Sequence, residues 1–457
     1  MFKSGFINKY KEKESIQTHE SILKLTLRMR RFISIVFIFP TVFFSTLAHG
    51  QNSVENASKK WSLNDSVQQV LAVSPRIHAA NAELDARKGD LSQAGAIPNP
   101  DVELNMNTKL GIEDDAGGAD LTQVAVSQPI PLRLSRQRKQ AKAIVEVARQ
   151  NFLLEQLSQE AETARRFHAL QLTTAMLEQA EEQLQFAVTY QKNNQNGKKD
   201  PLVRFMTPLE QKRLAIVSAS ARQEVANAEG KYSEALSGFK MLLQLPPNSS
   251  CKTEELKSVA SPSALEDLLA LQEEKHPAFI AARQQVKAAE AGIRLAYGEL
   301  FPDPRVKAFG ERDFLADSRR NFYGVALTFQ VPIWDWKLGS IKKAKSETKK
   351  VKFDFEALKQ DLQSQLRENH LHLGHLIEQT EHYHSHLLQP ARQVLELTQK
   401  GYSTGEQNGL ALVDASNTYF DAQARYLELL RDAWIEAAEL RLAAGISLID
   451  STPEAKP

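Results

Sequence analysis

The chain of 457 residues is poor in three features that usually mark a class of protein. It has a single cysteine, which excludes a disulfide framework. Its 57 basic and 56 acidic side chains nearly cancel, so no surplus of positive charge points to nucleic-acid binding. It has only one long apolar run, and its mean hydropathy of −0.39 argues against a bundle of membrane-spanning helices.

Catalytic signatures are missing as well. The sequence contains no Gly-x-Ser-x-Gly, no glycine-rich phosphate loop and no His-Glu-x-x-His. It therefore predicts neither an enzyme nor a bound cofactor.

The one apolar run, residues 32–48, follows three arginines and is followed by the small residue Gly50. This order is typical of a secretory signal, so residues 1–50 are predicted to be a cleaved signal peptide, with Met29 as an alternative start. Pro40 interrupts the run and disfavours the alternative of an N-terminal anchor helix. The rest of the chain has 49 basic and 53 acidic side chains, a net charge of about −4. Cys251 lies far from the cleavage site, so no lipid-anchor cysteine is expected.

The sequence predicts an internal duplication. A shift of 202 residues superposes Leu63 on Leu265 and Pro75 on Pro277. Further on, VAVSQPIP at 124–131 corresponds to VALTFQVP at 325–332. We predict a first repeat over residues 51–260 and a second over residues 261–457.

Each repeat shows the same order of patterns: a helix broken by proline, two strands and a hairpin of long helices. The strands are predicted within 98–131 and 304–332, and the hairpins at 132–245 and 337–446. Residues 132–196 contain no glycine or proline, and as one helix these 65 residues would be about 100 Å long. The return helix, 209–245, is shorter, so the opening helix, 63–94, is expected to stack end to end on it. The predicted fold is mainly α with a small β part.

The predicted strands alternate apolar and polar residues, as in Val102, Glu103 and Leu104. Such strands can cross a membrane only in a closed barrel, because an open edge leaves backbone groups unpaired in lipid. Four strands cannot close a barrel, so several copies are expected to pool their strands. The second repeat also carries aromatic residues suited to a membrane interface: Phe322, Tyr323, Phe329, Trp334 and Trp336.

The sequence resembles the TolC family of outer-membrane efflux proteins over nearly all of residues 61–449. The resemblance is carried by the duplicated Ser74-Pro75 and His276-Pro277, the strand exits SQPIPL and FQVPIW, and the second hairpin with Tyr402-Ser403-Thr404-Gly405. It implies a homotrimer with a 12-stranded barrel continuous with a helical barrel in the periplasm. It further implies a passive exit duct, working with a periplasmic adaptor and an inner-membrane resistance-nodulation-division pump or ABC transporter. The strand exit is somewhat closer to the cation-efflux, CzcC-like branch than to the multidrug members.

The resemblance also suggests functional residues at the hairpin tips. Of the family's two acidic gate positions, Asp414 matches the second, and the first falls on Ala411. Glu406 and Asp200 are weaker gate candidates, and a plain solvated aspartate is the alternative for Asp414. The residues expected to meet the adaptor are Gly405, Gly409, Leu410, Leu412, Pro208 and Leu209.

Six of the eleven histidines lie within residues 370–386. On a helix, His375, His382 and His386 share one face with Glu378, at a spacing that can hold a divalent cation. A solvated helix face is the competing interpretation.

Three other functions remain open at this point. A secreted coiled-coil structural or adhesion protein would explain the helices but not the four strands. A duct for a type I secretion system would share the fold, and a periplasmic metal-binding protein rests on the histidines alone.

Overall fold

The computed structural model describes residues 59–108, 120–195, 208–315 and 318–449. The predicted signal peptide and most of the first hairpin tip, including Asp200, lie outside these residues. Helices dominate, and the elements follow one another in the order β1 (Lys59–Trp61), α2 (Leu63–Val73), α3 (Pro75–Ala94), β2 (Asp101–Thr108), β3 (Asp120–Pro129), α4 (Leu134–Gln195), α5 (Pro208–Leu242), β4 (Cys251–Thr253), α6 (Leu265–Lys275), α7 (Pro277–Gly298), β5 (Arg305–Leu315), β6 (Ser318–Thr328), α8 (Leu338–Tyr383), η2 (His384–Leu388), α9 (Gln389–Thr404) and α10 (Gly409–Ala444).

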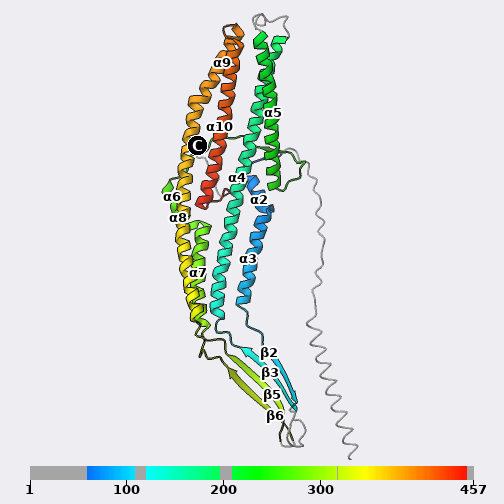
Figure 1. The fold of residues 1–457 in the computed structure, drawn as a ribbon, viewed down its shortest axis with the longest axis vertical. Helices are drawn as coiled ribbons and strands as arrows, with labels where there is room; N and C mark the ends of the chain where they lie inside the picture. Colours follow the sequence, from blue (N-terminus) through cyan, green and yellow to red (C-terminus); the bar gives the residue numbers. More distant parts are fainter. Residues whose placement is uncertain (1–58, 109–119, 196–207, 316–317, 450–457) are drawn as a thin grey trace, which may run out of the picture. The chain divides into compact units, whose positions relative to one another are not determined.

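The long helices lie side by side, and the strands are at one end of them (Figure 1). Along its length α4 packs against α5 and then against α2 and α3, as the stacking of the opening helix on the return helix predicts. On its other side α4 contacts α7 and α10, and α8 packs against both of these helices. No helix among the described residues is both long and apolar enough to cross a membrane.

Helix ends are set by local residues. Ser62 caps α2 by accepting a 3.1 Å hydrogen bond from the Asp65 amide, and Pro75 starts α3 because its missing N–H costs nothing in a first turn. The second repeat uses His276 in the same place, since its ring accepts a 3.1 Å hydrogen bond from the Ala278 amide before Pro277 begins α7.

The outgoing arm of the hairpin predicted over 337–446 is not one continuous α-helix. A π-turn, η2, separates α8 from α9. Its cause is Pro390, which cannot donate to the carbonyl of His386 and whose ring would crowd that carbonyl in a regular α-helix. The helical turn is wider here, and the amide of Gln389 donates a hydrogen bond to the carbonyl of His384.

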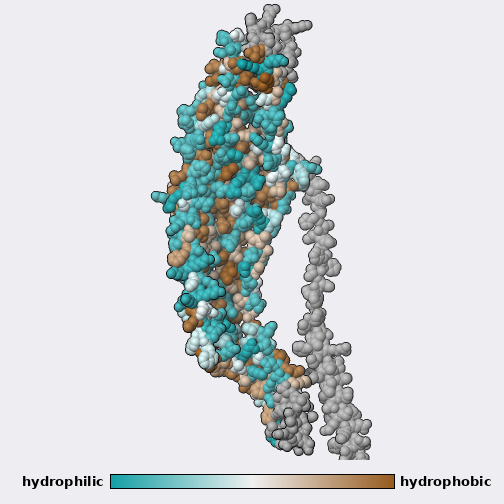
Figure 2. Space-filling view, in the orientation of Figure 1, coloured by the Kyte–Doolittle hydropathy of each residue, from teal (hydrophilic) through white to brown (hydrophobic). Residues whose placement is uncertain are grey.

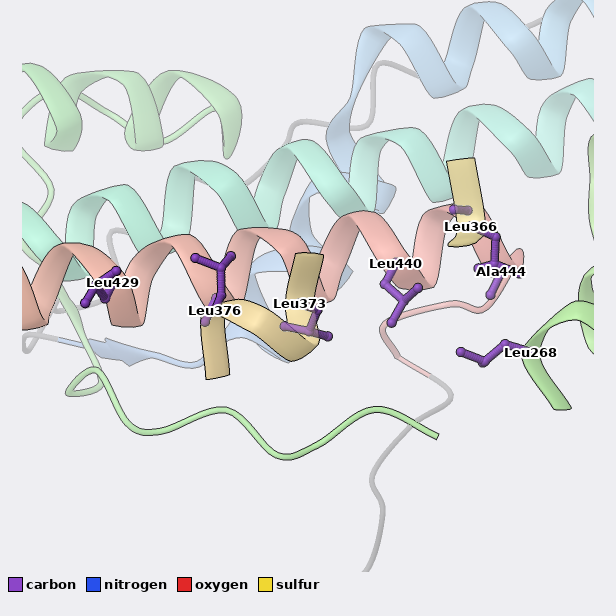
Figure 3. Packing of buried hydrophobic residues seen from close by; sticks show 9 residues of the cluster. Leu268, Leu366, Leu373, Leu376, Leu429, Leu440 and Ala444 are labelled. Atoms are coloured by element: carbon purple, nitrogen blue, oxygen red, sulfur yellow. The ribbon is translucent and has the colours of Figure 1, made fainter. Parts of the chain in front are cut away.

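The core runs along the seams between helices. Leu366, Leu373 and Leu376 of α8 pack with Leu429 and Leu440 of α10 in one cluster (Figure 3). On α5, Ala221 and Ala228 are seven residues apart and both buried. Small side chains at a spacing of seven let long helices approach closely.

A short parallel pair, β1 with β4, was not predicted. It joins the segment before α2 to the segment between the two hairpins, with Trp61 opposite Thr253. Three-residue strands carry too little periodicity to be recognised in a sequence.

Candidate functional site

The four remaining strands form one antiparallel sheet in the order β2-β3-β5-β6. The strands have 8, 10, 11 and 11 residues, close to the roughly 9–11 that cross a bilayer at a tilt. Among the described residues, β2 and β6 pair on one side only, so each sheet edge presents unused backbone donors and acceptors.

One face of this sheet is apolar and exposed. Register places Val102, Val126, Ala308 and Val325 in one row across the four strands, and Leu104, Val124, Gly310 and Tyr323 in the next. The side chain of Val102 is 71% exposed and that of Val325 is 77% exposed. A soluble protein rarely leaves such a surface uncovered, so this face is built for an apolar environment.

The opposite face is polar, and its residues are tied to one another across the strands. Arg305 lies 2.5 Å from Asp101, and Lys307 pairs with Glu103. Gln123 bridges Asn105 and Glu311 with two hydrogen bonds of 3.2 Å. Charged and amide groups in such rows suit a water-filled space.

The predicted aromatic belt needs one correction. Tyr323 lies on the apolar face and is 84% exposed, but Phe322 is its neighbour in β6 and therefore points to the polar face, in the row of Gln123 and Glu311. Phe329, Trp334 and Trp336 follow β6 and are all exposed.

The sequence did not predict one contact that connects the sheet to the helices. Asp303 accepts a 3.0 Å hydrogen bond from the Leu132 amide and lies 3.2 Å from the Arg133 guanidinium. It thereby fixes the start of α4 to the entry of β5. The sequence marks this position, since Asp303 lies between Pro302 and Pro304.

At the other end of the helices, the first turns of α5 lie beside the first turns of α10. Gly405 ends α9 in the left-handed conformation, with φ of 82°, and Asn408 caps α10 by accepting a 2.9 Å hydrogen bond from the Ala411 amide. Between α5 and α10 lies an apolar groove, and hydrophobic residues near the tips are visible in Figure 2. The groove is lined by Arg213, Leu214, Ile216, Val217, Gly409, Leu410 and Val413.

The predicted docking residues divide into exposed and buried ones. Leu209, Gly405 and Leu410 are exposed. Leu412 is 1% exposed within the cluster around Phe420, so it holds the tip together and presents no surface. Gly409 is buried as well, and the side chain of Pro208 lies outside the described residues.

Both gate candidates in the described part of the chain, Asp414 and Glu406, are exposed. Asp414 lies in the second turn of α10, and Glu406 follows the end of α9. Within the part of the chain that the structure describes, no hydrogen bond or ion pair joins these two carboxylates.

The predicted histidine triad does not form. Among the described residues no three histidine, cysteine, aspartate or glutamate side chains converge on a metal position. His375 is two helical turns from His382, while the rings of His382 and His386 stack with centroids 4.3 Å apart. His370 bonds the Ser263 carbonyl at 3.0 Å, and His372 lies 3.0 Å from Glu436.

Comparison with known proteins agrees with this geometry. The sequence profile described as "Outer membrane efflux protein" matches residues 268–446. Residues 268–446 belong to the outer membrane efflux protein family. The resemblance predicted from the sequence is thereby confirmed, and the matching proteins are efflux channels, which are not enzymes.

Known proteins are similar to this chain over most of its length. It is 23% identical to the cobalt-zinc-cadmium resistance protein CzcC of Cupriavidus metallidurans over 369 residues, which cover 80% of this chain and 85% of that protein. A solved structure of CusC matches with a TM-score of 0.70 at 17% identity, covering 84% and 92% of the two chains. The outer membrane protein VceC of Vibrio cholerae matches with a TM-score of 0.69 at 17% identity, covering 84% and 96%.

Proposed function

We propose that the chain is the outer-membrane duct of a tripartite efflux system, and that three copies build it. The observation that carries this proposal is the sheet with one apolar face, one polar face and two unpaired edges. Such a sheet satisfies its backbone in lipid only when neighbouring copies pair with β2 and β6. Three copies of four strands give a 12-stranded barrel, with the polar face lining the passage.

The helices of the three copies then continue the barrel into the periplasm. In the described part of the chain, α3 and α5 pack mainly on α4, and their other sides are proposed to pair with the next copy. We propose that the two similar halves, residues 51–260 and 261–457, arose by duplication, because the order of helices and strands occurs twice. Residues 1–50 would direct export as a cleaved signal peptide.

The hairpin tips are the proposed docking region for a periplasmic adaptor protein. Leu209 and Leu410 are exposed beside the apolar groove between α5 and α10, which suits the apolar side of a partner's helical hairpin. An inner-membrane resistance-nodulation-division pump or ABC transporter would supply the energy. Threefold symmetry would place three copies of Asp414 around the passage, where converging carboxylates favour cations.

Heavy-metal cations are the cargo we propose. The support is the similarity to a protein named for cobalt, zinc and cadmium resistance. Drugs are the alternative cargo, because the family that the sequence resembles also has multidrug members. Matching structures such as OprN and MtrE share the fold at similar levels of identity.

Deletion and complementation test this function. Loss of the gene should lower tolerance to cobalt, zinc or cadmium, and the wild-type gene should restore it. The protein should fractionate with the outer membrane and migrate as a trimer that dissociates on heating. Recovery as a soluble periplasmic monomer would contradict the duct, whereas sensitivity to drugs alone would contradict only the proposed cargo.

A further inference from the structure

The π-turn between α8 and α9 changes how two histidines face each other. In a regular α-helix, residues four apart are offset around the axis, whereas the wider π-turn places them more nearly above one another. His382 precedes η2 and His386 lies within it, and their rings are nearly parallel, with an interplanar angle of 15° and centroids 4.3 Å apart. Both side chains are exposed.

The Nδ1 atom of His386 has two hydrogen-bonding neighbours. The Nδ1 atom of His386 lies 3.2 Å from the carbonyl oxygen of His382, which can only accept. It also lies 2.8 Å from the Ser385 hydroxyl, which can donate to the carbonyl of Glu381 at 3.0 Å or to that of His382 at 3.2 Å. With its proton on Nδ1, donated to the His382 carbonyl, the His386 ring leaves the lone pair of Nε2 free for a metal ion. This second-shell arrangement is the one that metal-binding histidines use.

The neighbouring histidines are engaged elsewhere. His384 packs on the ring of Tyr426 in α10, on the opposite side of the turn from the pair. His370 and His372 bond Ser263 and Glu436. The pair is thus set apart by the turn itself, and among the described residues no third histidine, cysteine or carboxylate joins it.

We propose that His382 and His386 form a two-imidazole site for a divalent cation that prefers nitrogen ligands, such as Cu²⁺, Ni²⁺ or Zn²⁺. Small rotations of the two rings bring both Nε2 atoms toward one ion, and water fills the remaining positions. Of the three ions Cu²⁺ should bind most tightly, following the usual order for nitrogen sites. The site does not depend on the proposed duct, since both ligands come from one turn of one chain.

Titration of the full chain with Cu²⁺ tests the site. The protein is purified in detergent without a polyhistidine tag, and binding is measured by calorimetry for the wild type, His382→Asn, His386→Asn and the matched control His375→Asn. Each substitution in the pair should weaken Cu²⁺ binding by on the order of tenfold or more, whereas His375→Asn should bind like the wild type.

Electron paramagnetic resonance of the bound Cu²⁺ gives an independent readout. The wild type should show hyperfine splitting from two imidazole nitrogens, and each variant in the pair should show one fewer. Unchanged binding in both variants would overturn the site. An equal loss in His375→Asn would also overturn it, because the ligands would then be the wider triad that the sequence suggests.

Discussion

Gly445 ends α10 in the left-handed backbone conformation, with φ of 74°, and lies against His276 at the start of α7. A Cβ at this position would come within 2.9 Å of the His276 Cα atom. Gly445→Ala should therefore lower the free energy of unfolding by about 1–3 kcal/mol, through backbone strain and the close contact. Thermal unfolding followed by circular dichroism measures the change.

Gly374 is the matched control for this substitution. It lies within α8, and a Cβ there would meet nothing within 4 Å. Gly374→Ala should raise the free energy of unfolding by about 0.5–1 kcal/mol, because alanine loses less backbone entropy in a helix. Equal melting temperatures for the two variants would contradict the proposed role of Gly445.

His168 gives a prediction on pH. Its ring is buried in α4, stacks on Trp434 with centroids 5.0 Å apart and donates from Nδ1 to the Gln171 side chain at 2.8 Å. Burial lowers the pKa of His168 to about 4, from an ordinary value of 6.5. The unfolded chain therefore takes up a proton that the folded chain does not, between these two pH values. The stability contributed by neutral His168 is complete above pH 6.5 and decreases as the pH falls to about 4.

This effect amounts to about 3 kcal/mol at most. His168→Phe keeps a ring against Trp434 but cannot titrate, so its stability should fall less between pH 7 and pH 4.5 than that of the wild type. Denaturant unfolding at the two pH values measures both slopes. The same pH dependence in both proteins would show that another group is responsible.

At the scale of the elements, the two faces of β6 make the sharpest prediction. Val325 and Ala326 are neighbours, but Val325 belongs to the apolar face and Ala326 to the row of Asp101 and Lys307. Arginine on a lipid-facing strand costs about 2–4 kcal/mol near the middle of a bilayer. Val325→Arg should therefore reduce the amount of folded trimer in the outer membrane, whereas Ala326→Arg should assemble.

Immunoblots of unheated outer-membrane fractions measure this difference. Loss of the trimer in Ala326→Arg together with normal assembly of Val325→Arg would reverse the assignment of the faces. Normal assembly of both variants would mean that neither face meets lipid.

Most elements follow from residue patterns that the sequence displays openly. Alternation over 98–131 and 304–332 corresponds to β2, β3, β5 and β6, and the stretch without glycine or proline at 132–196 corresponds to α4. The π-turn was not predicted, because a proline such as Pro390 occurs equally well at a kink within a helix and in the first turn of a new one. The pairing of β1 with β4 joins short segments far apart in the sequence, which no local pattern reveals.

The functional residues were harder to predict than the elements. Leu412 follows a tip glycine and is apolar, as both a docking residue and a core residue would be, and only packing against Phe420 distinguishes the two. Phe322 was grouped with Tyr323 by composition, although adjacent strand residues point to opposite faces. His375 shares a helix face with the stacked pair but lies too far along the axis to join it. In each case the direction of the side chain or its distance from the other residues determines what it contacts, and the residue type alone does not give either.

At the scale of the whole molecule, the proposal requires β2 of one copy to pair with β6 of the next. Within one chain these strands are the two edges of the sheet, separated by β3 and β5, so their backbones lie about 14 Å apart. A disulfide needs Cα atoms closer than about 7 Å, so a bond between the two strands cannot form inside a single chain. The native Cys251 is buried and does not complicate the experiment.

Cysteine pairs can therefore report the assembly directly. Leu104→Cys on β2 is combined in turn with Tyr323→Cys, Val325→Cys or Leu327→Cys on β6, all on the apolar face, and membranes are oxidised with copper phenanthroline. At least one combination should give bands of two and three linked chains under denaturing conditions, and each single variant should stay monomeric on the same gel. Because the intramolecular bond is geometrically excluded, linked bands can come only from neighbouring copies. Absence of linked chains in every combination, with the protein present in the outer membrane, would mean that these edges are not joined between copies and that the barrel is not closed in this way.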